Sequence, residues 1–234
     1  MIADPARGLV YGNRGCLHDE HGRIRRHHNG RRWIACRLQF RGWHRSPLMA
    51  PGRFTELFFL DEATALAAGH RPCALCRRED YNRLTDFWRK VHPGQMGVDA
   101  IDAQLHAERW DASTGTRITR PLADPDDLPD GSFILAAGQP RLVLNGRMLV
   151  WTPAGYTDST PLDAHADAEL ITPPSLVALL RAGWEPVVPL LHPSANQTVA
   201  AVTVAEATAP AGIRPPIDGR TGPAPGPAAN RARA

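Results

Sequence analysis

Short apolar runs separated by turn-forming residues fill residues 8–60, and this pattern predicts strands. The runs are Leu9–Tyr11, a brief stretch at 22–24, Trp33–Phe40 and Phe54–Leu60. The second half of Trp33–Phe40 alternates, which places Cys36, Leu38 and Phe40 on one face of the predicted strand. Between the first two runs, Gly12-Asn13-Arg14-Gly15 predicts a tight turn just before Cys16.

Helical signals follow residue 60. The predicted helices cover residues 62–68, Pro72 to about Val91, and Val98 to about Trp110. Asp61 suits the N-cap of the first helix and Gly69 suits its end. In the second helix, Pro72 is tolerated in the first turn, and Leu84 and Trp88 recur at helical spacing.

The pattern becomes strand-like again after a polar connector at 111–131. Three short strands are expected over Phe133–Ala137, Pro140–Leu144 and Arg147–Trp151. Asn145-Gly146 lies between the last two and is a strong hairpin signal. A final short helix is expected over Ser175–Arg181.

These elements predict an α+β fold. We expect a zinc-stabilised N-terminal half of hairpin strands and helices at 1–93, and a helix followed by a small β-rich domain at 94–194. The remaining segment, 195–234, is dominated by Ala, Pro and Gly, so it is expected to be disordered.

Composition narrows the class of protein. Hydrophobic residues make up 43% of the 234 residues, enough for a core, and the four cysteines are too few for a disulfide scaffold. No stretch reaches the roughly 18 apolar residues that span a bilayer, and no secretion signal is visible at the start. We therefore expect a cytoplasmic protein with reduced thiols and no membrane partner.

The charge is uneven along the chain. Residues 1–93 carry 17 Lys+Arg against 9 Asp+Glu, although the whole chain has a formal net charge of only +3. A basic half suggests an anionic partner such as nucleic acid. The candidate contacts are Arg14, Arg25, Arg26, Arg31 and Arg32. The alternative is a solvated loop in a protein whose genome favours arginine, because Lys90 is the single lysine.

Cys73 and Cys76 form a C-x-x-C pair next to a predicted helix start, and such a pair can bind one metal ion. A redox pair of the thioredoxin type is the alternative, but it needs a strand leading directly into the motif. An Ala-rich, helix-like segment and Gly69 precede this pair instead. The pattern therefore favours zinc.

The segment 55–76 contains an aromatic pair, a short Ala-rich helix and the string Ala-Ala-Gly-x-Arg-Pro-Cys-x-x-Cys. It resembles the zinc-binding domain of the Ada family of bacterial DNA-repair proteins, and with Cys36 the resemblance extends over 36–76. The resemblance implies a zinc site with Cys36, Cys73 and Cys76 as ligands. For the fourth ligand we expect Cys16, with His18 as the alternative; an ordinary buried cysteine is the competing interpretation of Cys16.

The chain also departs from the pattern of the Ada family. Ada proteins accept a methyl group from DNA phosphate on a zinc-bound cysteine, and the ligands upstream of the aromatic pair form a Cys-x3-Cys. This chain has no such pair, since Arg32 and Phe40 stand four residues from Cys36. A closed, structural zinc site is therefore expected ahead of a methyl acceptor.

A second constellation lies on the predicted third helix. Asp102 stands one turn before His106 and could orient its imidazole, and Glu108 follows two residues later. This arrangement would suit a metal-dependent hydrolase or nuclease. A zinc deaminase is disfavoured because its His-x-Glu precedes its Pro-Cys-x-x-Cys, and a solvated helix face with an ion pair is the simpler interpretation.

The combined expectation is a zinc protein that binds nucleic acid through its basic half, in DNA repair or processing. The alternatives are a hydrolase using His106 and Glu108, a methyl acceptor at a zinc-bound cysteine, and an interaction module with purely structural zinc. The chain as a whole resembles uncharacterised bacterial proteins, and that resemblance implies no function. The sequence does not indicate an oligomeric state.

Overall fold

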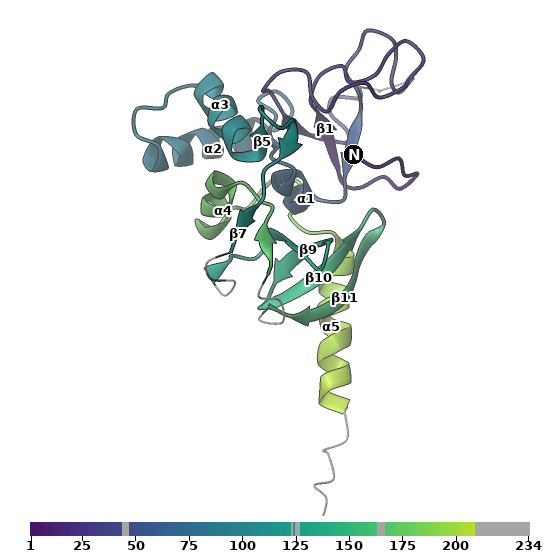
Figure 1. Cartoon of the computed structure of the whole chain (residues 1–234), viewed down its shortest axis with the longest axis vertical. Coiled ribbons are helices and arrows are strands. Elements are labelled where there is room, and N and C mark those ends of the chain that lie inside the picture. The colour runs from purple at the N-terminus through teal and green to yellow at the C-terminus, as the bar shows by residue number, and fades with distance from the viewer. Residues whose placement is uncertain (44–46, 123, 125–126, 163–166, 209–234) are drawn as a thin grey trace, which may run out of the picture.

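The computed structural model describes residues 1–43, 47–122, 124, 127–162 and 167–208. It confirms the α+β prediction: a small sheet and helices form the N-terminal half, and a larger sheet dominates the C-terminal half (Figure 1). Within the described residues, no helix has the length and apolar character needed to cross a membrane.

The N-terminal sheet has four strands in the order β3-β1-β2-β4. Their bounds are Val10–Asn13 (β1), Ile34–Arg37 (β2), Leu57–Phe59 (β3) and Arg71–Pro72 (β4). β1 runs antiparallel to β2 and β3, whereas β2 runs parallel to β4. In this register Tyr11 lies opposite Cys36, so both side chains lie on the same face of the sheet.

Three helices cover this half: α1 (Glu62–Ala67), α2 (Arg78–Val91) and α3 (Val98–Arg109). The predicted cap is confirmed, because an Asp61 carboxylate oxygen accepts hydrogen bonds from the backbone N–H and the hydroxyl of Thr64 at 2.8 and 2.7 Å. The predicted start of the second helix at Pro72 is wrong. Pro72 lies in β4 opposite Ala35, and the chain turns before α2 begins at Arg78.

The C-terminal half contains a hairpin and a six-stranded sheet of order β11-β10-β9-β8-β12-β7. The strands are Trp110–Asp111 (β5), Thr116–Arg117 (β6), Arg120–Pro121 (β7), Phe133–Ala136 (β8), Gln139–Leu144 (β9), Arg147–Thr152 (β10), Gly155–Pro161 (β11) and Glu169–Leu170 (β12). Asn145 and Gly146 both have positive φ, 52° and 67°, as the predicted hairpin requires.

Two further helices complete the described chain, α4 (Pro174–Arg181) and α5 (Pro193–Thr208). α5 runs along β11 and extends past the sheet (Figure 1). The start of the segment 195–234, for which composition predicted disorder, is therefore helical. Fully buried Ala195 packs in the core, and Thr198 donates a 3.0 Å hydrogen bond to the Tyr156 carbonyl, so these contacts stabilise the helix. Residues 209–234, the rest of that prediction, lie outside the described residues.

Both halves contribute to the same cores. One core cluster joins Leu60, Ala63 and Ala67 to side chains of β8–β11 and to Ala195. Another joins residues of α1, α2 and α3 to α4 and Trp184. The two faces of α1 therefore depend on both halves, while the boundary at residue 93 stays a prediction.

The carboxyl end of α1 is covered by arginines from distant segments. Arg109 donates to the Gly69 carbonyl, and Arg117 donates to the carbonyls of Ala67 and Ile171. The bonds to Ala67 and Gly69 satisfy carbonyls at and just beyond the end of α1, and the positive charges suit the negative end of the helix dipole. Arg109 also stacks on Trp33, with its guanidinium carbon 4.0 Å from the ring centroid.

A buried ion network fixes the start of α2 against α1. Arg77 donates two hydrogen bonds to the Glu62 carboxylate, at 2.6 and 2.7 Å, and one to Asp80 at 2.8 Å. All three side chains are fully buried. Asp80 also accepts from Arg83 at 2.6 Å and from the backbone N–H of Val187 at 3.1 Å. Because Arg77 directly follows Cys76, this network also holds the cysteine turn in place.

Candidate metal centre

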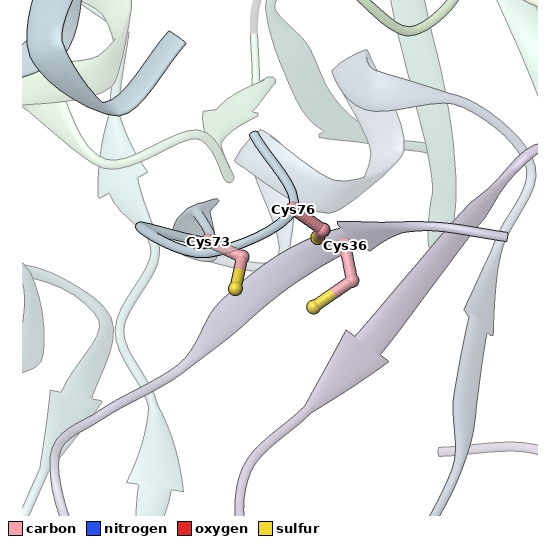
Figure 2. A group of neighbouring side chains, drawn as sticks. All are labelled: Cys36, Cys73 and Cys76. Atoms are coloured by element: carbon pink, nitrogen blue, oxygen red, sulfur yellow. The ribbon is translucent and has the colours of Figure 1, made fainter. Parts of the chain in front are cut away.

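Three cysteines come together on the N-terminal sheet and could hold a metal ion. The sulfur atoms of Cys36, Cys73 and Cys76 all lie within 4.8 Å of one another. Figure 2 shows them converging, with Cys36 from β2 and the other two from the segment after β4. The structure thus brings together three of the four cysteines that the sequence proposed as ligands.

The parallel pairing of β2 with β4 places these residues. Ala35 lies opposite Pro72, and the Ala35 carbonyl accepts a 2.9 Å hydrogen bond from the Cys73 N–H. The next residue along the chain is a cysteine in both cases, Cys36 after Ala35 and Cys73 after Pro72. The chain then turns, with a 3.0 Å hydrogen bond from the Arg77 N–H to the Cys73 carbonyl, so that Cys76 faces the other two.

Hydrogen bonds within the cluster favour a negative charge on one of its three sulfurs, that of Cys73, and the pKa values of Cys36 and Cys76 are raised. Cys73 accepts hydrogen bonds from Cys36 and Cys76 and from the Leu75 N–H at 3.4 Å, and these lower the pKa of Cys73. The same bonds to Cys73 and Cys76, followed by burial, raise the pKa of Cys36. The Arg37 N–H is directed at the Cys76 sulfur. A cation at the centre would let all three sulfurs ionise.

The cluster is sheltered by aromatic rings. Tyr11 is buried beside the cysteines, and Phe40, Phe54 and Phe58 pack around them. Tyr11 meets Phe54 and Phe58 edge to face, with centroids 6.2 and 5.5 Å apart. Sequence analysis missed this shell, although the alternation of β1 could have placed Tyr11 on the cysteine face. The rings limit access of water to the sulfurs.

Cys16 does not join the cluster, so the expected four-thiolate site is not what the structure shows. Its thiol lies 3.5 Å from the His18 carbonyl. The cause is the register of the first hairpin: Asn13 lies opposite Ile34, so the turn carrying Cys16 is at the end of β2 away from Cys36. His18 is engaged elsewhere, with its Nδ1 2.6 Å from the Thr55 hydroxyl.

The donor set fits a soft or borderline cation. Three cysteine sulfurs, two of which accept N–H···S hydrogen bonds, suit Zn²⁺, which binds cysteine sulfur at tetrahedral sites. Within the described residues, no further Cys, His, Asp or Glu belongs to the group. The described part of the chain therefore supplies three ligands.

The structure does not assemble the second constellation that the sequence suggested. Asp102 forms a buried, two-pronged ion pair with Arg71, both contacts being 2.8 Å, so it does not orient His106. Glu108 accepts hydrogen bonds from Ser175, including a 3.0 Å bond from its N–H at the start of α4. Both carboxylates have structural partners, which removes the basis for the proposed hydrolase.

His106 lies among rings instead. Its ring centroid is 4.9 Å from that of His28 and 6.0 Å from that of Trp33. Burial, together with the nearby charge of Arg109, lowers the pKa of His106 to about 4. The side chain is therefore neutral at physiological pH, and its Nδ1 has no hydrogen-bond partner among the described residues.

Of the five arginines proposed for nucleic acid, one points inward and four are exposed, one of them in an ion pair. Arg14 points inward, where its Nε donates to His70 at 3.2 Å and its guanidinium stacks on Trp33, so it is not a surface contact. Arg25 pairs with Asp19 at 2.8 Å. Arg26, Arg31 and Arg32 are exposed.

A cleft of about 670 Å³ adjoins the centre, and its lining includes Arg31 and Arg32. Ile34 and Phe54 belong both to the cleft wall and to the apolar shell of the cysteines. Asn13, Asn29 and Asp99 also line the cleft. Sequence analysis did not single out these three residues for binding, because the cleft forms between segments far apart in the chain.

Comparisons with known proteins add no further assignment to this geometry. No protein-family model, curated protein or solved structure matches the chain.

Proposed function

We propose that the protein binds one zinc ion through Cys36, Cys73 and Cys76, and that the ion stabilises a fold that binds nucleic acid. The convergence of the three sulfur atoms within 4.8 Å carries the proposal. Buried thiols so close together are electrostatically costly when ionised and are stabilised by a cation. Zinc is the ion that cytosolic C-x-x-C sites with additional cysteine ligands most often hold.

The role assigned to zinc is structural. The ion would join the end of β2 to the turn after β4, elements connected by a long stretch of chain. Because such a site does not exist in the unfolded chain, the free energy of metal binding adds to the free energy of folding. The low exposure of the ligands, 7% for Cys36, 9% for Cys73 and 6% for Cys76, supports this role over a reactive one.

Nucleic acid is proposed as the partner because of charge. Residues 1–93 carry the excess of arginine, and Arg26, Arg31 and Arg32 are exposed in one loop next to the sheet that bears the cysteines. The likeness of segment 36–76 to the Ada zinc domain supports the same assignment, and extends it to DNA repair or processing.

The presence of three protein ligands among the described residues favours one alternative function, methyl acceptance. Zinc sites with three protein ligands usually keep an open position and are often reactive. A zinc-bound thiolate could then accept a methyl group, as the Ada likeness implies. Treating the zinc-loaded protein with a simple methyl donor and mapping the modified residue by mass spectrometry tests this alternative. Methylation of one ligand cysteine, lost when zinc is removed, would favour it.

The zinc content of purified protein tests the central claim. We expect one zinc per chain in the wild type, and weakened or lost zinc after Cys36→Ser, Cys73→Ser or Cys76→Ser. Cys16→Ser is the matched control, because Cys16 lies outside the cluster, and it should keep its zinc. A wild type without zinc would refute the proposal. Loss of zinc in Cys16→Ser would mean that the first hairpin rearranges to supply a fourth thiolate.

Salt dependence tests nucleic-acid binding separately. Binding carried by arginine–phosphate contacts weakens steeply as salt rises, with a slope of log K against log salt of roughly −0.7 to −0.9 per contact. Fluorescence anisotropy of labelled oligonucleotides between about 50 and 200 mM salt measures it. Zinc-loaded protein that binds neither single strands nor duplexes at low salt would leave the metal site without this function.

A further inference from the structure

The cleft beside the cysteine cluster combines charged, polar and apolar side chains. Its lining offers unpaired cations, carboxamides, a free carboxylate and an apolar wall. We propose that it binds one unstacked nucleotide of a single-stranded nucleic acid. This inference rests on the proposed nucleic-acid function and specifies where and in what form the strand is bound.

Arg31 and Arg32 line the cleft, and we assign the phosphate to them. Both are exposed, and their guanidinium groups have no hydrogen-bond or ion-pair partner in the part of the chain that the structure describes. The Arg31 carbonyl accepts a 2.6 Å hydrogen bond from buried Arg109, which fixes the backbone at this point. Two free guanidiniums on a fixed backbone are suited to a phosphate.

Asn29 and Asp99 also line the cleft, and the base is assigned to them. The carboxamide of Asn29 and the carboxylate of Asp99 have no partner in the described chain. A carboxamide can both donate to and accept from a base edge, and a carboxylate accepts from an exocyclic amino group. Ile34 and Phe54 supply an apolar wall, against which the base or sugar can pack.

The backbone holds Asn29 in position. The Asn29 N–H donates to the Arg14 carbonyl at 2.8 Å, which ties this loop to the first turn. Gly15 packs against it: a Cβ on Gly15 would come within 2.8 Å of the Asn29 Cβ. Because Gly15 also has φ of +92°, this close contact needs glycine.

Charge and size together define the ligand. A bare anion would be attracted by the arginines but repelled by Asp99, whereas a nucleotide offers a phosphate at one end and hydrogen-bond donors at the other. The volume of about 670 Å³ lies within the range of small-molecule sites, roughly 300–1,000 Å³. A base stacked in a duplex cannot enter such a cleft without being extruded, which costs free energy. The geometry therefore favours a single strand.

Binding of a fluorescein-labelled oligonucleotide of eight cytidines to zinc-loaded protein tests the proposal, with the matched duplex in parallel. We expect the single strand to bind at least tenfold more tightly. Arg31→Ala and Asn29→Ala should each weaken single-strand binding about tenfold, and only the arginine change should reduce the salt slope by about one. Arg26→Ala removes the same charge from the same loop outside the cleft, so it should weaken binding less than Arg31→Ala.

Three results would overturn the inference without touching the zinc site. They are equal affinity for single strand and duplex, equal effects of Arg26→Ala and Arg31→Ala, and no effect of Asn29→Ala. If cytidine monophosphate alone competes as well as the oligonucleotide, the ligand is a free nucleotide and the assignment to a strand is wrong. Absence of any oligonucleotide binding would instead refute the proposed function.

Discussion

Replacing Arg77 with methionine should destabilise the protein strongly, because Arg77 neutralises a carboxylate that has no contact with water. Glu62 and Arg77 are both fully buried and joined by two short hydrogen bonds. Without Arg77, Glu62 must stay charged in the core or take up a proton. Burial already raises the pKa of Glu62, even with Arg77 present.

The cost of protonating Glu62 sets the size of the expected destabilisation. For a carboxyl group with the ordinary pKa of 4.5, taking up a proton at pH 7 costs about 3.4 kcal/mol. Removing one partner of a buried ion pair typically costs about 3–5 kcal/mol. We therefore expect Arg77→Met to reduce the free energy of unfolding by about 3 kcal/mol. Loss of the contact between Arg77 and Asp80 adds less to the destabilisation, because Asp80 keeps Arg83 and the Val187 N–H as partners.

A double-mutant cycle separates this electrostatic effect from loss of packing. The double variant Glu62→Leu/Arg77→Met removes both charges and should recover at least half of the loss, since an apolar pair of similar volume is often neutral in place of a buried ion pair. Urea unfolding, monitored by circular dichroism with zinc in excess, measures each free energy. Excess zinc is needed because Arg77 adjoins Cys76, and partial loss of the metal would add to the effect.

Two results would refute this reasoning. One is an Arg77→Met variant within about 1 kcal/mol of the wild type, which would mean that Glu62 is solvated or paired elsewhere. The other is a double variant as unstable as the sum of the single variants, which would mean that packing and not charge dominates. The difference in free energy of unfolding between wild type and Arg77→Met should also shrink as the pH falls, because Glu62 then takes up its proton at lower cost.

Two further predictions concern the region around α1 and α3. Burial lowers the pKa of His106 from 6.5 to about 4, so between these values the unfolded chain binds a proton that the folded protein does not. Stability should therefore fall as the pH falls through this window, and His106→Gln should flatten the urea-midpoint curve; equal slopes would contradict the assignment. Gly69→Ala should destabilise by about 2 kcal/mol or more, because φ is +79° and a Cβ would lie 2.4 Å from the Arg109 Cδ. Gly94→Ala has a similar φ, +88°, but no neighbour within 4 Å, so thermal melting should show a smaller loss; equal losses would exclude the clash as a cause.

Local signals in the sequence located most of the cysteine cluster. Cys73 and Cys76 share one turn, and their spacing alone predicts a joint role. Cys36 was reached through the Ada resemblance, and the parallel pairing of β2 with β4 places it beside them. Cys16 could not be judged in this way, because its position depends on the register of a hairpin whose connecting loop is long and irregular.

The contrast between local signals and long-range pairing also explains where the predicted and observed folds differ. Pro72 suits a helix start as well as a strand end, and its pairing with Ala35, far away in the chain, decided between them. Two-residue strands such as β5 and β12 are too short to show any periodicity. The cleft depends on side chains from several segments, and the local sequence does not show which of them lack hydrogen-bond partners in the fold. Helix caps and the Asn145-Gly146 hairpin were predictable because their signals lie within a few residues.

The sharing of α1 between the two halves has a consequence for synthesis of the chain. The apolar partners of Ala63 and Ala67 include Phe133, Tyr156 and Ala195, which leave the ribosome long after α1. At roughly 5–20 residues per second, the intervening stretch takes on the order of ten seconds to make. The cysteine ligands emerge before this delay. Early capture of zinc would give the nascent chain a local anchor while α1 still lacks its partners, and a cell short of zinc would then expose this segment to chaperones and proteases.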